Sequence, residues 1–441
     1  MTTTRKLFIG VLVGKLAILA LVIGIWGESR LIWGDSVTYL QLGKNIFSSG
    51  GFSREIQIMP LYPFVVGLFN EYISHGVLVL SIVQAIAVAG IAVLIYKLGF
   101  FIMPAHYAIF AAVGASFEPV ASILHLLVMT ETLLVFLLML FTYFFIKYLE
   151  RSGIWYLIRA AGALALSVLI KAIGTYLFIV PVVFILFHRR FTLAERVAKA
   201  FLFWVVFAVI LVPWMYRNYL LVGEFKITQE GSGNICGYQL PLVFAVDRGI
   251  NITTQSVTSD PEFQNLLRQC EAYTEAENLF WIVKKYPYAF FKANTLAALS
   301  LFTNDGFATL FQKSSPGLPP HHNYLTPMVF MGDEWRQNLT SGLSELTGLE
   351  LLAFIVGKLF RILLSVAAFS GIYVFLKHDR NPYVLFMLLV FAYLISVTVF
   401  STAFAVGARL RFPIDPFLFL FALFWVARQL AGPARLKIST D

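Results

Sequence analysis

The sequence contains few charged residues and few cysteines. Charged residues make up 13% of the 441 residues, and the two cysteines are Cys236 and Cys270. Hydrophobic residues make up 59%, and the mean hydropathy is +0.79. A water-soluble fold of this length does not have enough interior to bury so much apolar surface. The composition therefore excludes an ordinary soluble enzyme and indicates an all-α polytopic membrane protein.

Motifs for nucleotides and metals are also missing. The sequence contains neither a Gly-x-x-x-x-Gly-Lys loop nor a Gly-x-Gly-x-x-Gly loop, so we expect no nucleotide-binding domain. If the protein drives an uphill reaction, the energy must arrive with the substrate. The pair His321-His322 looks like a metal motif, but adjacent residues do not share a face of a helix or strand. We therefore predict no cofactor and no metal site at this pair, and leave open a divalent cation elsewhere as the alternative.

Several apolar runs approach the roughly 20 residues that a helix needs to cross a bilayer. We expect about ten membrane-spanning helices, at 7–26, 76–98, 104–118, 126–147, 154–171, 173–187, 200–216, 351–376, 382–402 and 412–428. The first run contains Lys15 and lacks a convincing small-residue cleavage site, so it is interpreted as an uncleaved helix rather than a signal peptide.

The basic residues set the expected orientation. With the N-terminus in the cytoplasm, most basic connections between runs become cytoplasmic, as the positive-inside rule requires. The net charge of +9 is therefore no sign of nucleic-acid binding. Two segments, 27–75 and 218–350, then face the outside. We expect a transmembrane region at 1–217 that includes the first external segment, an external region at 218–350, and a second transmembrane region at 351–441.

Asp35 lies in the first external segment, in Gly34-Asp35-Ser36-Val37-Thr38-Tyr39. The mix of apolar and polar residues in 27–75 predicts two short helices at the membrane surface. Asp35 is either a helix N-cap or a carboxylate that accepts a proton from a hydroxyl or amine. Tyr39 follows one helical turn later and is expected on the same face.

Glu131 opens the fourth main apolar run at the same external side. An acid there is tolerated by the helix dipole, but ionisable groups at membrane depth usually line a cavity or pair with a partner. Four cations also sit at external helix ends, against the positive-inside trend: Lys171, Arg217, Arg409 and Arg411. Each is either a snorkelling side chain or a ligand for an anionic lipid phosphate.

Both cysteines fall in the long external segment. In an oxidising compartment Cys236 and Cys270 can form a disulfide. The sequence does not test the geometry, so the pairing is left open.

Five stretches together resemble the GT-C-fold glycosyltransferases, such as the protein O-mannosyltransferases and the bacterial transferases that add 4-amino-arabinose to lipid A. They are Gly34-Asp35 with Tyr39 and then Pro60-Leu61-Tyr62-Pro63; Thr130-Glu131-Thr132-Leu133; Lys171-Ala172-Ile173-Gly174; Pro213-Trp214-Met215-Tyr216-Arg217-Asn218-Tyr219 with Gly223-Glu224-Phe225; and Ala408-Arg409-Leu410-Arg411-Phe412-Pro413-Ile414-Asp415-Pro416. Relatives often carry Arg-Pro-x-Gly at the third stretch, so Lys171 and Ala172 are departures.

The resemblance implies a GT-C-like helical bundle and an inverting sugar transfer from a polyprenyl-phosphate donor. Asp35 would be the catalytic base, and Glu131 would support the acceptor site or orient Asp35. Tyr39, Lys171, Arg217, Arg409 and Arg411 would bind substrate, the four cations at the donor phosphate. We expect a multi-pass protein of the bacterial inner membrane, with both termini cytoplasmic and the active site periplasmic.

The acceptor is left open between a lipid, a cell-envelope glycan and a protein. The main alternative function is a multi-pass transporter of a lipid-linked or anionic substrate. Transporters usually show internal repeats and interrupted helices at the midplane. Here no repeat is visible, and the polar candidates gather at one external face, which favours the transferase.

Overall fold

In the computed structural model, the described part of the chain consists of helices joined by turns and loops, with no strand there. This confirms the all-α prediction. The described residues are 2–48, 51–52, 57–188, 190–250, 257–272, 274–306, 326–331, 334–344, 346–378, 381–403 and 408–431. The pair His321-His322, for which no metal site is predicted, lies outside the described residues.

Among the described residues, six helices are long and apolar enough to cross a membrane, which makes the chain a multi-pass membrane protein. They are α1 (Thr3–Trp26), α4 (Gly76–Gly99), α7 (Glu131–Arg151), α10 (Leu193–Val222), α19 (Gly348–His378) and α20 (Pro382–Thr402). Shorter helices occupy the other four predicted spans: α5 (Ala105–Phe117), α8 (Ile154–Ile170), α9 (Ile179–Phe187) and α22 (Asp415–Ala431). The number of crossings remains a prediction.

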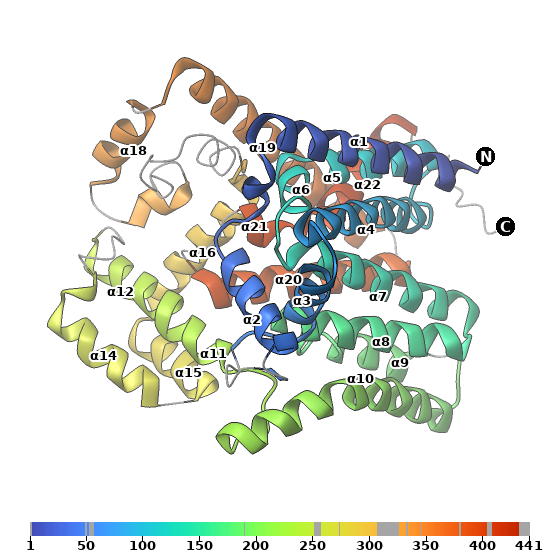
Figure 1. Cartoon of the computed structure of the whole chain (residues 1–441), viewed down its shortest axis with the longest axis horizontal. Coiled ribbons are helices and arrows are strands. Elements are labelled where there is room, and N and C mark those ends of the chain that lie inside the picture. Colours follow the sequence, from blue (N-terminus) through green and yellow to red (C-terminus); the bar gives the residue numbers. More distant parts are fainter. Residues whose placement is uncertain are drawn as a thin grey trace. The chain divides into compact units, whose positions relative to one another are not determined.

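The chain divides into two compact units. Unit 1 comprises residues 1–228, 366–393 and 412–441, and unit 2 comprises 229–365 and 394–411. In unit 1, α7 packs on α8, α8 on α10, and α4 on α1, α5 and α7 (Figure 1). The buried faces of these helices form the core.

The two short helices expected in the first external segment are α2 (Ser36–Ser48) and α3 (Leu61–Tyr72), which follow a 3₁₀ turn, η1 (Glu28–Leu31). They pack closely because glycines meet at their crossing. A Cβ added to Gly43 would come within 2.7 Å of the Gly67 nitrogen, so any larger residue would push the helices apart.

Unit 2 contains the short helices of the predicted external segment. Among the described residues they are α11 (Glu230–Asn234), η3 (Ile235–Gln239), α12 (Leu240–Arg248), α14 (Pro261–Ala272), α15 (Glu275–Lys285), α16 (Pro287–Thr303), η5 (Pro327–Met331) and α18 (Trp335–Ser344). Unit 2 also contains α21 (Ala408–Arg411), which comes from the second predicted transmembrane region. α15 begins with a capping box in which Thr274 and Glu277 satisfy each other's backbone N–H groups.

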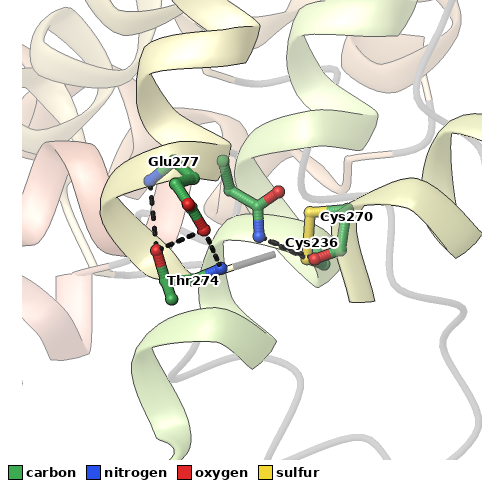
Figure 2. Close-up of a disulfide and its surroundings, with 5 residues drawn as sticks. Cys236, Cys270, Thr274 and Glu277 are labelled. Atoms are coloured by element: carbon green, nitrogen blue, oxygen red, sulfur yellow. Dashed lines mark hydrogen bonds between the residues drawn. A yellow bond between two sulfur atoms is a disulfide. The ribbon is translucent and has the colours of Figure 1, made fainter. Parts of the chain in front are cut away.

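Cys236 and Cys270 form a disulfide, which settles the pairing that the sequence left open. The bridge joins η3 to α14, and Figure 2 shows it beside the Thr274–Glu277 capping box. Asn278 on α15 donates to the Cys270 carbonyl at 2.7 Å, so three helical segments meet at this point.

Removing the disulfide should destabilise unit 2. The cysteines are 34 residues apart, and closing a loop of that length stabilises a fold by about 3–4 kcal/mol in the chain-entropy view. We expect Cys236→Ser/Cys270→Ser to lower the thermal midpoint of the purified protein relative to the oxidised parent. Mass spectrometry of tryptic peptides, with and without reduction, checks the bridge directly; free thiols in the untreated protein would contradict it.

Candidate active site

Asp35 is exposed and directly precedes α2, whose start is fixed by the next residue. The buried Ser36 hydroxyl accepts a hydrogen bond from the Trp33 N–H at 3.0 Å and lies 2.9 Å from the Val128 carbonyl oxygen. Val128 N–H in turn donates to the Leu31 carbonyl at 3.1 Å. The backbone that carries Asp35 is therefore held against residue 128.

Glu131 is the first residue of α7 and is almost fully buried, at 1% side-chain exposure. Its Oε1 lies 3.2 Å from the Lys171 ammonium, whose side chain is 22% exposed. Lys171 stands where α8 ends and the chain turns into an extended conformation, with φ −156°. A carboxylate at a helix N-terminus is also stabilised by the helix dipole. The structure thus joins two of the predicted site residues in one buried ion pair.

The two acids are brought to the same part of unit 1. Val128, which is bonded to the start of α2, is three residues before Glu131. One acid is exposed and the other is buried and paired with a cation. Because an exposed carboxylate and a buried, paired one differ in how they bind protons, Asp35 and Glu131 are suited to different roles.

The segment before α7 is held by side chains from α4. Gln84 donates to the carbonyls of His125 at 3.0 Å and Leu127 at 2.7 Å, and Ser81 donates to Leu126 at 2.6 Å. The Tyr62 hydroxyl donates to the Gln84 side-chain oxygen at 3.2 Å. Sequence reasoning missed Gln84 and Ser81, although a glutamine and a serine inside an apolar run are a signal of a polar partner at membrane depth.

Tyr39 lies differently from the expectation that it shares Asp35's exposed face. Its ring is buried, edge-on to the ring of Tyr62 with the centroids 5.0 Å apart. In this structure Tyr39 therefore links α2 to α3, and any contact with substrate stays a prediction.

Arg217 near the end of α10 contacts the segment 27–75, at Phe52. Its guanidinium lies 4.4 Å from the centroid of the Trp214 ring and donates to the Asn218 side chain at 2.9 Å. A second nitrogen is 3.5 Å from the Phe52 carbonyl oxygen, and Phe52 packs edge-on against Trp214. Arg217 is thus placed beside the loop between α2 and α3, in the same unit as Asp35 and Glu131.

Arg409 and Arg411 lie on α21 and belong to unit 2, whereas the site residues described above belong to unit 1. Arg411 is fully buried and donates to backbone carbonyls at the end of α16. Together with Lys358 and Ser365 it satisfies the four carbonyls of residues 301–304. Cations favour the C-terminus of a helix, so Arg411 has a clear structural role. Whether it or Arg409 also binds substrate stays a prediction.

Within the described residues, no group of three or more His, Cys, Asp or Glu side chains could hold a metal ion. Asp35, Glu131 and Lys171 are the residue types that transfer protons and stabilise negative charge. The geometry of unit 1 therefore suits acid–base chemistry beside an anion.

A family model described as dolichyl-phosphate-mannose-protein mannosyltransferase matches residues 59–216. The matched range contains Tyr62, Gln84, Glu131 and Lys171, and it begins after Asp35. The match supports the resemblance to GT-C glycosyltransferases that the sequence motifs indicated.

Two similar solved structures are of ArnT from Cupriavidus metallidurans. The one bound to undecaprenyl phosphate is 17% identical with a TM-score of 0.40, over 97% of this chain and 78% of that one. The apo structure is 16% identical with a TM-score of 0.37, over 93% and 76%. No curated protein matches the chain.

Proposed function

We propose that this protein is a membrane glycosyltransferase that moves a sugar from a polyprenyl-phosphate donor to an acceptor at the external face. The observation that carries the proposal is the exposed Asp35 at the start of α2, which the Ser36–Val128 bond fixes to the chain three residues before Glu131 of the Glu131–Lys171 pair. The family match over 59–216 supports the reaction class.

The proposed reaction is a single inverting displacement at the anomeric carbon. An acceptor hydroxyl or amine attacks that carbon and forms the new bond, while its proton passes to the Asp35 carboxylate. The bond between the anomeric carbon and the phosphate oxygen breaks, and the electron pair leaves with the polyprenyl phosphate. Fixed cations at that oxygen stabilise the developing charge.

Lys171 and Arg217 are the cations of unit 1 proposed to stabilise the leaving group. Glu131 has a supporting part in this scheme: its carboxylate fixes the direction of the Lys171 ammonium, which is only partly exposed. Arg409 and Arg411 are retained as proposed donor contacts of unit 2.

The external location is supported by the disulfide in unit 2, because such bridges persist in oxidising compartments. A bacterial periplasm provides that environment. The proposed acceptor is a lipid or a cell-envelope glycan.

The test is a comparison of envelope glycolipids and glycans by mass spectrometry in a deletion strain and in the complemented strain. A product that loses the mass of one sugar on deletion would identify both sugar and acceptor. Transfer must also occur with detergent-solubilised protein, because a transporter needs a sealed membrane and a transferase does not. Activity that exists only in sealed vesicles would overturn the proposal.

Replacing Arg217 with glutamine should weaken binding of the donor lipid. Losing one charge-assisted contact costs about 1.5 kcal/mol, so we expect the Kd for undecaprenyl phosphate to rise about tenfold. Arg159→Gln is the matched control, since Arg159 also stacks on an aromatic ring, that of Phe144, at 5.8 Å. If Arg217→Gln and Arg159→Gln bind undecaprenyl phosphate with equal affinity, Arg217 is not part of the donor site.

A further inference from the structure

A buried polar cluster lies around Lys15, in the middle of the apolar helix α1. Lys15 is fully buried, although a lysine inside a membrane span is energetically costly and usually has a function. Its ammonium donates to the Ala121 carbonyl and to the Ser122 hydroxyl, both at 3.2 Å. It also lies 5.1 Å from the centroid of the Phe117 ring.

A glycine on α1, next to Lys15, allows Phe117 to approach the helix closely. A Cβ added to Gly14 would come within 2.6 Å of the Phe117 ring, so glycine permits the close approach. Phe117 ends α5, and the bonds from Lys15 to Ala121 and Ser122 hold the next short helix, α6 (Pro119–Leu124), against α1. At its start, Glu118 accepts from the N–H groups of Val120 at 2.8 Å and Ala121 at 3.1 Å.

His125 adds a second link between α1 and α6. One ring nitrogen lies 3.2 Å from the Ala121 carbonyl oxygen, and the other lies 3.4 Å from the Lys15 carbonyl oxygen. Glu118, buried like Lys15, also attracts the ammonium electrostatically. Both the side chain and the backbone of Lys15 are therefore engaged by residues 117–125.

Residues 118–130, which we call the coupling segment, continue from this cluster to the two acids. Gln84 and Ser81 of α4 hold the carbonyls of residues 125–127, and Ser36 lies against the carbonyl of Val128. Glu131 follows at once. One end of the coupling segment is thus fixed by Lys15, and the other end carries the contact to α2 and begins α7.

We propose that Lys15 is a positioning residue for sugar transfer, which acts through the coupling segment to set the placement of Asp35 relative to the Glu131–Lys171 pair. This rests on the proposed function. Lys15 does not touch substrate in this scheme. If it only anchored α1 in the bundle, its loss would change the amount of folded protein and leave the activity of each folded molecule intact.

The experiment compares Lys15→Met, Lys15→Arg and the matched control Lys97→Met in full-length protein. Lys97 also lies over an aromatic ring, that of Tyr143 at 5.1 Å, and it is on α4 away from the coupling segment. Two quantities are measured on folded protein: hydrogen exchange of peptides covering 120–134, and affinity for undecaprenyl phosphate. Sugar transfer per folded molecule is measured by mass spectrometry in complemented deletion strains.

We expect Lys15→Met to increase exchange at the Val128 and Leu134 amides and to lower transfer about tenfold, because misplacement by about 1 Å is enough for such a loss. Affinity for undecaprenyl phosphate should not change. Lys15→Arg should restore part of the transfer, and Lys97→Met should behave as the parent. If Lys15→Met does not fold, Ser122→Ala removes one partner of the ammonium and should show the same pattern more weakly.

Unchanged exchange, or unchanged transfer per folded molecule, would overturn the inference. The exchange measurement needs no substrate, so it separates two kinds of failure. If exchange rises but Asp35→Asn is fully active, the proposed function fails while Lys15 still holds the segment. If Asp35→Asn is inactive but exchange in Lys15→Met is unchanged, the proposed function stands and the role of Lys15 is rejected.

Discussion

Replacing Asp35 with asparagine should reduce sugar transfer by about three orders of magnitude, within the 10²–10⁴-fold range of general base catalysis. Asparagine has nearly the same shape but cannot take the proton of the acceptor. Asp35 is exposed and the start of α2 is fixed by Ser36, so the fold and the donor affinity should be preserved. Transfer is measured in the complemented deletion strain and corrected for folded protein.

Glu71→Gln is the control for this substitution. Glu71 is an exposed acid of the same segment, 27–75, at the end of α3, and it accepts from the Asn70 amide at 3.0 Å. It should retain full activity. Normal transfer by Asp35→Asn would show that Asp35 serves the helix start rather than the chemistry, and the proposed mechanism would be wrong.

Much of the helical arrangement could be predicted because it depends on local hydropathy. All ten apolar runs coincide with helical segments, and the two short helices of the first external segment are present as α2 and α3. The boundaries were less accurate. The run at 126–147 was expected to be helical from its start, but α7 begins at Glu131 because the carbonyls of 125–128 bond to side chains of α4 and α2.

The candidate site was predictable in its residue types and less so in their partners. Charge at a predicted external helix end identifies Glu131 and Lys171 as candidate site residues. The sequence does not show that they pair, because the pairing depends on the packing of α7 against α8. Tyr39 was expected beside Asp35 from helical spacing, while its ring is buried against Tyr62 of another helix. Arg411 looked like a phosphate ligand, and its contacts with the end of α16 are visible only in three dimensions.

Replacing Lys171 with methionine should have the second large effect, on both stability and rate. The change leaves the Glu131 carboxylate buried without its cation, and breaking a buried pair from one side costs on the order of 3–5 kcal/mol. Because Lys171 is 22% exposed, the lower end of that range is expected. Losing one cation beside the leaving group should also lower kcat by about 10²-fold.

The double variant Glu131→Gln/Lys171→Met separates these two effects. Removing both charges together should recover most of the stability, since no unpaired charge remains buried. It should not recover the rate, because the leaving group still lacks its cation. Thermal unfolding and transfer per folded molecule are compared across the parent, the two single variants and the double variant. Recovery of both quantities would make the Glu131–Lys171 pair purely structural and would leave Arg217 as the only proposed leaving-group contact of unit 1.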